Sequence, residues 1–428
     1  MASPPGVAVG ISRVPSFLLG FVSGSASTIV RGSGAYHLWV LSLLGVLAAG
    51  AWCYGVQLDR GLIVTGMRDP MSWGFYIGNF AFLVGVAAAA VMLVIPAYIY
   101  HWKPIKEVVL FGEIMAIAAI VMCMLFVSVD LGRPDRIWHL LPLVGNPNFP
   151  HSLLIWDIFV LSCYFVLNYF IVSYIVYKGY TGQPYSKRFL LSLVFLSIPV
   201  AIGIHTVTAF LFMGLKARPF WHSAILAPRF LASAFCSGPA LMVIVFQVVQ
   251  RFYGRAISDA AFQKIGELLA YAMVINLFLL ASELFTEFYA RTAHSVHAEL
   301  QWFGAGELAS LPIYAWGAVA FNVSALIIFM FPALRSRLPL LTIGCLLAVV
   351  GVYVEKGMGL LLPGMTPDMR GEIYAYHPTW VEVGVSAGIW AAGALLFTLM
   401  SRVAIAVERR ELLHPMAPRQ PETEGASR

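Results

Sequence analysis

Carboxylate and imidazole side chains recur at the ends of long apolar stretches in this chain. Asp130 closes one stretch, Asp157 follows the start of the next, and His139 lies in the connection between them. Charged groups are costly to bury at membrane depth, so they commonly mark a pathway or a binding site. We expect these three side chains to converge on one shallow polar pocket. The simpler alternative for Asp130 is an ion pair with Arg133 or Arg136.

His205 is the one histidine well inside an apolar stretch. Its near-neutral pKa in water suits hydrogen bonding to a quinone carbonyl or relaying a proton; the alternative is a packing role. A membrane b-type haem needs two facing histidines at that depth, so we expect no haem. The cysteines occur singly, which predicts packing residues and neither a disulfide framework nor a metal or iron–sulfur site. They are Cys53, Cys123, Cys163, Cys236 and Cys345.

Three glutamates inside apolar stretches are candidates for proton transfer. Glu283 and Glu287 are four residues apart and therefore share a helix face. Glu113 lies about two turns inside its stretch, and neither Glu113 nor Glu283 has a basic partner nearby in the sequence. Arg291, four residues beyond Glu287, offers that glutamate a local ion pair as the alternative.

The elements that must position these groups are long and apolar. Apolar residues make up 60% of the 428-residue chain and charged residues 11%, with a mean hydropathy of +0.82. A window of about 19 residues predicts ten spans, which must be helices because lipid cannot satisfy backbone polar groups. The spans are 38–58, 72–100, 107–129, 152–177, 188–213, 226–250, 266–290, 312–334, 338–354 and 380–405.

The net charge of +6 comes from an uneven distribution of basic residues. Most of the Lys and Arg lie in the termini and in every second loop, including Lys103, Lys106 and Arg255. By the positive-inside rule, both termini face the cytoplasm of a bacterial or archaeal cell. The basic residues therefore set topology and do not indicate a nucleic-acid partner. Three connections on the other side are rich in Pro, Trp and Tyr, which predicts fixed turns that dock a partner. They are 131–151, 214–229 and 355–380.

Prolines recur near the start of corresponding spans and divide the predicted helices into two sets of four. Asp69-Pro70 precedes the second span and Ala227-Pro228 opens the sixth. Parallel halves are common in membrane proteins that arose by duplication. We therefore expect an all-α integral membrane protein with two four-helix bundles and one extra helix at each end. The predicted parts are an arm (1–37), a first helix (38–58), a first bundle (72–213), a second bundle (226–354), a last helix (380–405) and a tail (406–428).

Four stretches resemble the NrfD/PsrC family of quinone-reactive membrane subunits, which includes the polysulfide reductase membrane subunit. They are residues 70–87 (PMSWGFYIGNFAFLVGVA), 128–136 (SVDLGRPDR), 218–238 (RPFWHSAILAPRFLASAFCSG) and 355–399 (EKGMGLLLPGMTPDMRGEIYAYHPTWVEVGVSAGIWAAGALLFTL). The resemblance extends over most of the chain. Within the family, the ten-span length is most like DsrP, the membrane subunit of the Dsr sulfur-metabolism complex.

The resemblance implies a quinone pocket in the first bundle near the periplasmic face, for menaquinone or ubiquinone. It also implies a periplasmic ferredoxin-like iron–sulfur partner, cytochrome and further membrane subunits, and no haem or cluster in this chain. Carried onto this sequence, the pocket residues are Asp130, His139, Asp157, His205 and Arg229. The proton-transfer candidates are Glu113, Glu283 and Glu287.

Two other classes of protein fit part of the pattern. A proton-coupled secondary transporter of a small anion would use the same buried carboxylates with Arg229, and a scaffold would bind no quinone. Transporters often contain Gly- or Pro-broken helices in mid-membrane. Pro199 is the main internal proline here, and most others lie at span ends. The sequence therefore favours a quinol-interacting subunit that exchanges electrons with a partner, with proton translocation as a further expectation.

Overall fold

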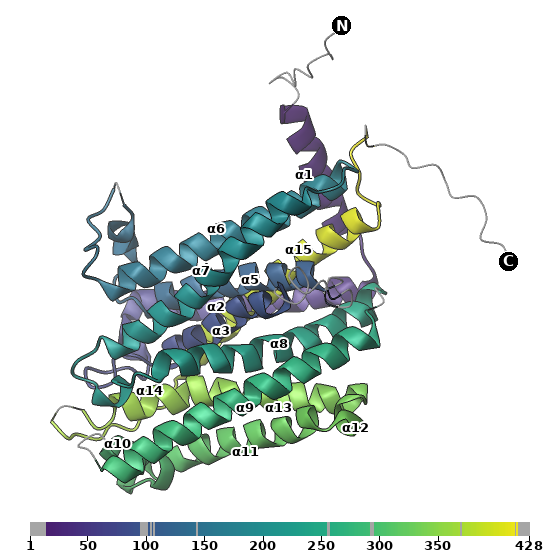
Figure 1. Cartoon of the computed structure of the whole chain (residues 1–428). Helices are drawn as coiled ribbons and strands as arrows, with labels where there is room; N and C mark the ends of the chain where they lie inside the picture. The colour runs from purple at the N-terminus through teal and green to yellow at the C-terminus, as the bar shows by residue number, and fades with distance from the viewer. Residues whose placement is uncertain are drawn as a thin grey trace, which may run out of the picture.

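The chain folds into a bundle of long helices that run side by side (Figure 1). This computed structural model describes residues 14–415 and 417, apart from 95–101, 103–104, 106–107, 143, 255–256, 292–294 and 369. The predictions for Lys103, Lys106, Arg255 and the outermost termini lie outside the described residues. Among the residues described, no strand forms beyond an isolated bridge between Arg68 and Met71.

Ten long helices correspond to the ten predicted spans and confirm the all-α membrane fold. They are α2 (Gly34–Arg60), α3 (Phe75–Val94), α5 (Val109–Asp130), α6 (Leu153–Tyr180), α7 (Lys187–Met213), α8 (Leu226–Tyr253), α9 (Asp259–Ala290), α11 (Leu311–Met330), α13 (Leu338–Lys356) and α15 (Trp380–Glu408). The shorter elements are α1 (Val14–Val30), η2 (Leu62–Val64), η4 (Pro134–Leu140), η5 (Pro219–Trp221), α10 (Ser295–Phe303), η6 (Gly306–Leu308), α12 (Pro332–Arg335) and α14 (Met358–Met365). Helix α1 lies within the range predicted as an arm.

The long helices form two closed rings of four. In the first ring α3 packs on α5, α5 on α6, α6 on α7 and α7 on α3. In the second ring α8 packs on α9, α9 on α11, α11 on α13 and α13 on α8. The rings meet along α8, which also packs against α3 and α7. We call these rings the first and second bundles.

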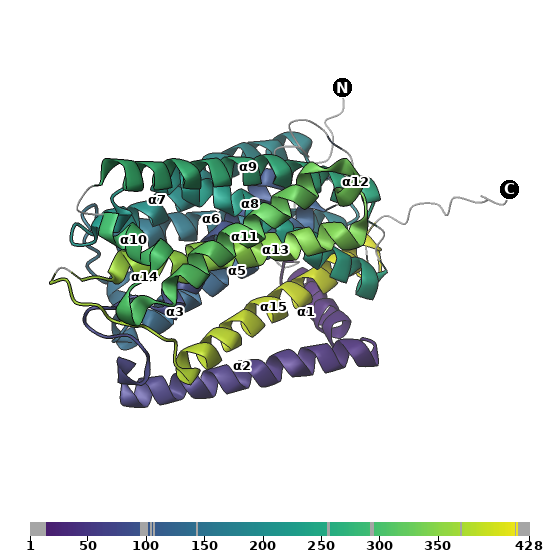
Figure 2. The same cartoon turned by 90° about the horizontal axis from the view of Figure 1, so that it is seen from below.

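The two extra helices pack on each other at the edge of the molecule. Helix α2 lies along α15, and α15 in turn packs on α5, α6 and α3 (Figure 2). Where α2 and α15 cross, Gly50 faces Gly388 so closely that a methyl group on either would overlap the other backbone. Small residues allow such close approach between membrane helices, where dispersion contacts drive association.

The ninth helix differs from the prediction, which ended it at residue 354. Helix α13 continues to Lys356, breaks at Gly357 and resumes as α14. The two pieces together form one apolar stretch, Leu338–Met365, long enough to span a membrane. The first residues of the predicted external loop 355–380 are therefore helical, and Glu355 and Lys356 belong to the second bundle.

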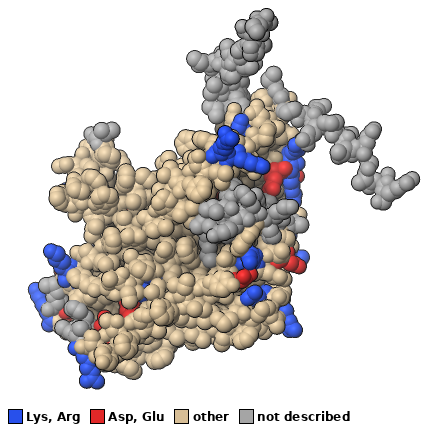
Figure 3. Space-filling model, viewed as in Figure 1, with Lys and Arg blue, Asp and Glu red and all other residues tan. Residues whose placement is uncertain are grey.

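Charge and exposure agree with a membrane-spanning body. Nine described helices are long and apolar enough to cross a bilayer, and α3 contributes a shorter apolar helix. On the face in Figure 3, charged side chains gather at the two ends and leave an uncharged band between them. Large apolar side chains such as Phe170 and Phe278 are more than half exposed within the helices. They would face lipid.

Candidate functional site

The alternating direction of the helices places most of the predicted site residues at one end of the molecule. Helices α5, α7, α9 and α13 end there, whereas α6 and α8 begin there. Helix α1 and the last turns of α15 lie at the opposite end (Figure 1). We call the first the α10 end and the second the terminal end. Of the predicted site residues, Glu113 is nearest the terminal end, because α5 begins at Val109.

Asp157 is buried between two helices of the first bundle. Its Oδ1 accepts a hydrogen bond from the hydroxyl of Thr208 on α7 at 2.6 Å. His205 lies one turn before Thr208 and is fully buried. Neither of its ring nitrogens has a hydrogen-bond partner among the described residues. Buried polar atoms are rarely left unpaired, so a missing ligand or water is the ordinary explanation. We call Asp157, His205 and Thr208 the first-bundle site.

Asp130 lies at the end of α5 in a separate polar cluster. Gln57 of α2 donates to the carbonyl of Val129 at 2.7 Å, and the Tyr76 hydroxyl donates to the Gln57 side chain at 2.7 Å. The Oδ1 atom of Asp130 is buried without a partner among the described atoms. The structure brings Asp130 next to the α2–α3–α5 junction, and its connection to Asp157 stays a prediction.

The predicted clamp between Asp130 and an arginine of the following loop is absent from the described part of the chain. Arg133 instead pairs with Asp135 at 2.9 Å, and both side chains are largely exposed. The hydrogen bond from Arg133 holds the pKa of Asp135 below its usual range. This pair orders the start of η4 and leaves Asp130 unneutralised by that loop.

His139 does not join the buried site. It is exposed on η4 and stacks on Trp138 with 3.8 Å between ring centroids. The expected convergence of His139 with two buried carboxylates is therefore not seen. The reason is that Pro134 starts a 3-10 turn that runs along the surface. His139 fits a surface contact better than a pocket.

Glu113 is buried deep in the first bundle. Its Oε2 atom has no partner among the described residues, and Tyr164 of α6 is its electrostatic neighbour. One turn beyond Tyr164, the Asn168 amide donates to the Tyr164 carbonyl at 2.7 Å. Asp157, Tyr164 and Asn168 are all buried on α6, seven and four residues apart. Polar groups therefore recur along the inside of this bundle from the α10 end inward.

The second bundle holds a denser charge cluster, centred on Arg229. Its guanidinium pairs with Glu283 of α9, and its other terminal nitrogen bonds Glu355 of α13 at 2.8 Å. The second oxygen of Glu355 accepts from Asn276 at 3.3 Å and from Asn322 at 3.0 Å. These contacts place Arg229 in the second bundle and pair Glu283. The expectations of Arg229 in the first-bundle pocket and of an isolated Glu283 were wrong.

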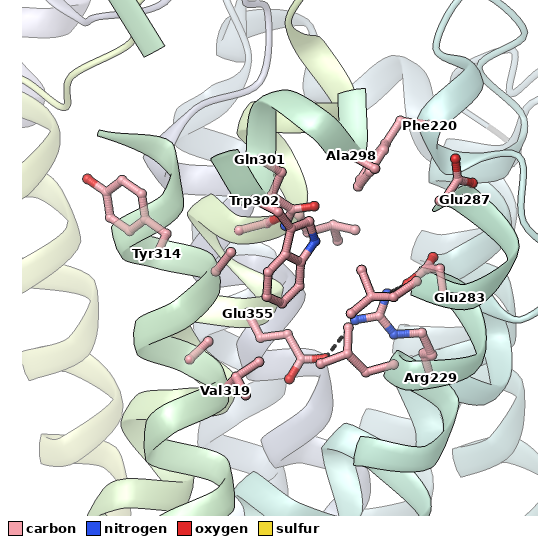
Figure 4. A pocket seen from close by; sticks show the side chains of 16 residues that line it. Phe220, Arg229, Glu283, Glu287, Ala298, Gln301, Trp302, Tyr314, Val319 and Glu355 are labelled. Carbon is pink, nitrogen blue, oxygen red and sulfur yellow. Dashed lines mark hydrogen bonds and ion pairs between the residues drawn. The ribbon is translucent and has the colours of Figure 1, made fainter. Parts of the chain in front are cut away.

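A small cavity of about 40 Å³ opens beside this cluster. Figure 4 shows Arg229, Glu283 and Glu355 on one side and Trp302 of α10 with its indole facing the cavity. The Trp302 nitrogen and Glu287 Oε2 are buried without partners among the described atoms. A cavity of this size holds a few water molecules. Arg291 is exposed, and no pair between it and Glu287 occurs in the described structure.

One of the three connections predicted to form fixed turns, loop 214–229, is held by hydrogen bonds to neighbouring segments. Arg218 donates to the carbonyl of Met365 at 2.6 Å and to that of Pro70 at 2.8 Å. Burial lowers the pKa of Arg218 from its usual value. Trp221 is fully buried and donates to the carbonyl of Leu360 at 3.0 Å. Loop 214–229 thereby ties the start of the first bundle to α14.

Glu355, Lys356 and Asn322 were missed as site residues. The Glu-Lys pair at the end of an apolar run suggested a helix end, although the apolar segment GMGLLLPGM follows at once. That continuation was the available signal for a helix that goes on past two charges. Asn322 had no signal of its own, because an amide within a span is also common in packing.

Comparison with known proteins gives a match over most of the chain. The family model described as "Polysulphide reductase, NrfD" matches residues 63–366. A protein of Halobacterium salinarum named as a dimethyl sulfoxide reductase membrane subunit is 28% identical, over 88% of this chain and 91% of that one. A selenate reductase subunit of Mesobacillus selenatarsenatis is 22% identical, over 88% and 96%. The Hdr-like menaquinol oxidoreductase integral membrane subunit of Archaeoglobus fulgidus is 23% identical, over 86% and 95%.

Proposed function

The chain belongs to the polysulphide reductase NrfD family, and we propose on that basis that it is the quinol-interacting membrane subunit of a respiratory oxidoreductase complex. Relatives along nearly its whole length are named as subunits of reductases or oxidoreductases, one of them a menaquinol oxidoreductase. The chain is a multi-pass integral membrane protein. The quinone would be menaquinone or ubiquinone.

The head group of the quinol would bind at the first-bundle site. The observation that carries this proposal is the pairing of a buried carboxylate, Asp157, with a single hydroxyl donor while His205 one turn away has two unpartnered nitrogens. A quinol presents two hydroxyl groups, and a carboxylate and a neutral imidazole are both hydrogen-bond acceptors. The site thus lacks the donors that a quinol brings.

Quinol oxidation releases two electrons and two protons. Asp157 and His205 would accept the hydroxyl protons, as general bases within hydrogen-bond reach do. Thr208 would hold the Asp157 carboxylate in place. The electrons would pass to a periplasmic iron–sulfur partner, or return from it in the opposite direction. Asp130 would line the approach to the site, and His139 would lie at its surface.

Protons would move through the carboxyl groups within the bundles. Glu113 lies between the first-bundle site and the terminal end, where Tyr164 and Asn168 supply further polar groups. Glu283 and Glu287 would serve the second bundle, where the cavity beside Arg229 has room for water. Carboxyl groups inside transporters and pumps commonly carry protons.

The partner subunits would dock at the α10 end. The connection after α5 exposes Trp138 and His139, and the Arg218 and Trp221 contacts fix the neighbouring loop. An iron–sulfur subunit there would lie close to the first-bundle site. Cytochrome and further membrane subunits would complete the complex, with this end periplasmic and both termini cytoplasmic. A Dsr-type sulfur-metabolism complex is one such assembly.

The test compares quinol binding and turnover in the intact complex. A short-chain menaquinol analogue is titrated while tryptophan fluorescence is followed, in wild type, Asp157→Asn and His205→Ala. We expect saturable quenching that both substitutions weaken, and a loss of quinol oxidation in Asp157→Asn with assembly intact. Asp59→Asn, an exposed aspartate at the same end, is the matched control. Wild-type affinity and turnover in Asp157→Asn would refute the assignment.

One observation favours the transporter alternative. Helix α13 breaks at Gly357, directly after the buried Glu355 and Lys356. Broken helices beside a buried charged site are typical of secondary transporters. Purification of the chain as a solitary protein that carries an anion into vesicles, without quinol-dependent quenching, would support that class over the proposed one.

A further inference from the structure

Two consecutive residues of α13 carry opposite charges, and their side chains point in different directions. Glu355 points into the second bundle, where Arg229, Asn276 and Asn322 hold its carboxylate. Lys356 is buried and donates from Nζ to the carbonyl of Phe230 on α8 at 2.8 Å. Neighbouring residues on a helix point about 100° apart, so the two charges face different sides of α13.

Lys356 occupies the seam between the two bundles. Its ammonium lies over the ring of Phe230, 4.7 Å from the centroid. A Cβ atom added at Gly85 of α3 would lie 3.4 Å from Nζ, an ordinary van der Waals distance. The ammonium therefore lies close to a helix of each bundle.

The ammonium has no dedicated counter-ion within hydrogen-bond distance among the described residues. Its one described hydrogen bond goes to a neutral carbonyl, and the Glu355 carboxylate beside it is engaged by Arg229. A buried charge is expensive unless it is paired. Such a cost is commonly retained where the charge has a function.

The charged and titratable groups around Lys356 come from both bundles. Glu355 precedes it on α13, Arg229 and Cys236 lie on α8, and His205 lies on α7. Helix α7 reaches this seam through Phe212, whose ring lies 5.7 Å from that of Phe230. Lys356 thus lies between the Arg229 cluster and α7, which carries His205 seven residues before Phe212.

We propose that Lys356 couples the Arg229 cluster to the first-bundle site. Its positive charge, together with the charges of that cluster, sets the electrostatic field at the first-bundle site. Lys356 acts as a positioning residue, because it touches neither the proposed quinol position nor a reacting atom. When Lys356 is protonated, its positive charge on the seam side of α7 favours the neutral imidazole of His205, the form that can accept a proton. A proton gained or lost at Glu355 or Glu283 changes the net field that reaches His205 through the seam.

This inference rests on the proposed quinol site and makes a separate prediction. Removal of the ammonium makes protons easier to bind at Asp157 and His205, so the pH profile of quinol turnover moves to higher pH. Removal of the Glu355 negative charge has the opposite sign and moves the profile to lower pH. A residue that only fills the seam changes stability and leaves the position of the profile unchanged.

The experiment measures quinol oxidation by the intact complex from acid to alkaline pH. Lys356→Met removes the charge and the hydrogen bond, whereas Lys356→Gln removes the charge and keeps a donor for the Phe230 carbonyl. Lys216→Met, an exposed lysine at the same end, is the matched control. We expect both Lys356 variants to shift the profile upward, with roughly fivefold or greater change in apparent quinol affinity, the scale of coupling between sites.

The outcomes are distinguishable. Profiles of Lys356→Met and Lys356→Gln that superimpose on wild type overturn the proposal. A shift in Lys356→Met alone overturns it as well, since it assigns the lysine a hydrogen-bonding role. A shift in both, with Glu355→Gln moving the other way and Lys216→Met unchanged, supports it. If Asp157→Asn binds quinol as wild type does, the proposed site itself is wrong and the inference falls with it.

Discussion

The two bundles bury similar acidic groups and neutralise them differently. In the first, Asp157 has one hydroxyl donor and His205 has no partner in the described structure. In the second, Arg229 pairs with Glu283 and Glu355, and amide groups occupy the remaining Glu355 oxygen. The Arg229 cluster therefore neutralises its own charges, although Glu287 Oε2 and the Trp302 nitrogen beside it have no partner among the described residues. The difference teaches that the first-bundle site, whose carboxylate has no cation beside it, is the better candidate for binding a ligand that donates hydrogen bonds, and the Arg229 cluster for stability or proton storage.

The largest effect should follow from removing the central cation of the second bundle. Arg229→Met leaves two buried carboxylates facing each other, which costs about 3–5 kcal/mol of folding free energy. Thermal unfolding of the purified complex measures it, with the exposed Arg136→Met as control. An unchanged unfolding temperature would mean that the second bundle does not depend on this pairing, and the comparison would fail.

The two carboxylates that face Arg229 should differ from each other. Glu355→Gln turns an amide toward donors from Arg229, Asn276 and Asn322, whereas Glu283→Gln leaves Arg229 paired with Glu355. We expect Glu355→Gln to cost about 1–3 kcal/mol more, the penalty of unsatisfied buried donors. Denaturant unfolding of both variants provides the measurement. Equal losses of unfolding free energy in the two variants would mean that the stability of the cluster depends on Arg229 and not on the extra donors to Glu355.

A smaller and functional effect is expected in the first bundle. Thr208→Val removes the single described donor to Asp157. A hydrogen bond to a charged group contributes about 1.5–3 kcal/mol, so quinol turnover should fall roughly 10- to 100-fold. Thr206→Val on the same helix is the control, since its hydroxyl bonds only the Ile202 carbonyl within the helix among the contacts described. Similar turnover in the two variants would count against a role for Thr208.

The smallest effect belongs to the exposed pair on η4. Arg133 holds the pKa of Asp135 below its usual value; a group with a lowered pKa stabilises its loop above the unfolded-state pKa and loses that contribution as pH falls through the folded one. Protection of the amides in residues 131–140 against hydrogen exchange, relative to their intrinsic exchange rates, should therefore decrease below about pH 4. Arg133→Ala should show that loss of protection already at neutral pH, with global unfolding unchanged. Slow exchange at neutral pH in Arg133→Ala would show that the Arg133–Asp135 pair does not protect this loop from exchange.

Sequence patterns predicted the helices well because each span is decided by its own apolar content. The ten spans and the placement of Asp157 near one helix end follow from hydropathy and spacing within one segment, whereas the two groups of four were predicted from prolines that recur between segments. The seventh span was predicted to begin at 266 although α9 begins at Asp259, and the ninth span was ended before the apolar segment that follows Lys356. Two charges at Glu355 and Lys356 outweighed the apolar segment after them, although partners on neighbouring helices hold both charges in the bundle.

The pairing of charges between helices was not predictable from the sequence. Glu283 lacks a basic neighbour within two turns of its own helix, and Arg229 lies at the start of another. Their contact depends on how α8 and α9 rotate against each other, which periodicity does not determine. The same reason explains why His139 was placed with Asp157, since both lie near the same membrane boundary but only one faces inward.

The close crossing of Gly50 and Gly388 has a consequence for synthesis of the chain. Helix α2 is the first long helix to leave the ribosome, and α15, the helix it packs against, is the last. During translation the face of α2 that carries Gly50 remains exposed to lipid until every other long helix has been inserted. Closure of the molecule therefore comes at the end of translation, and a chain that stops before α15 would hold α2 only through contacts such as that of Gln57 with Val129 and would leave its glycine face uncovered.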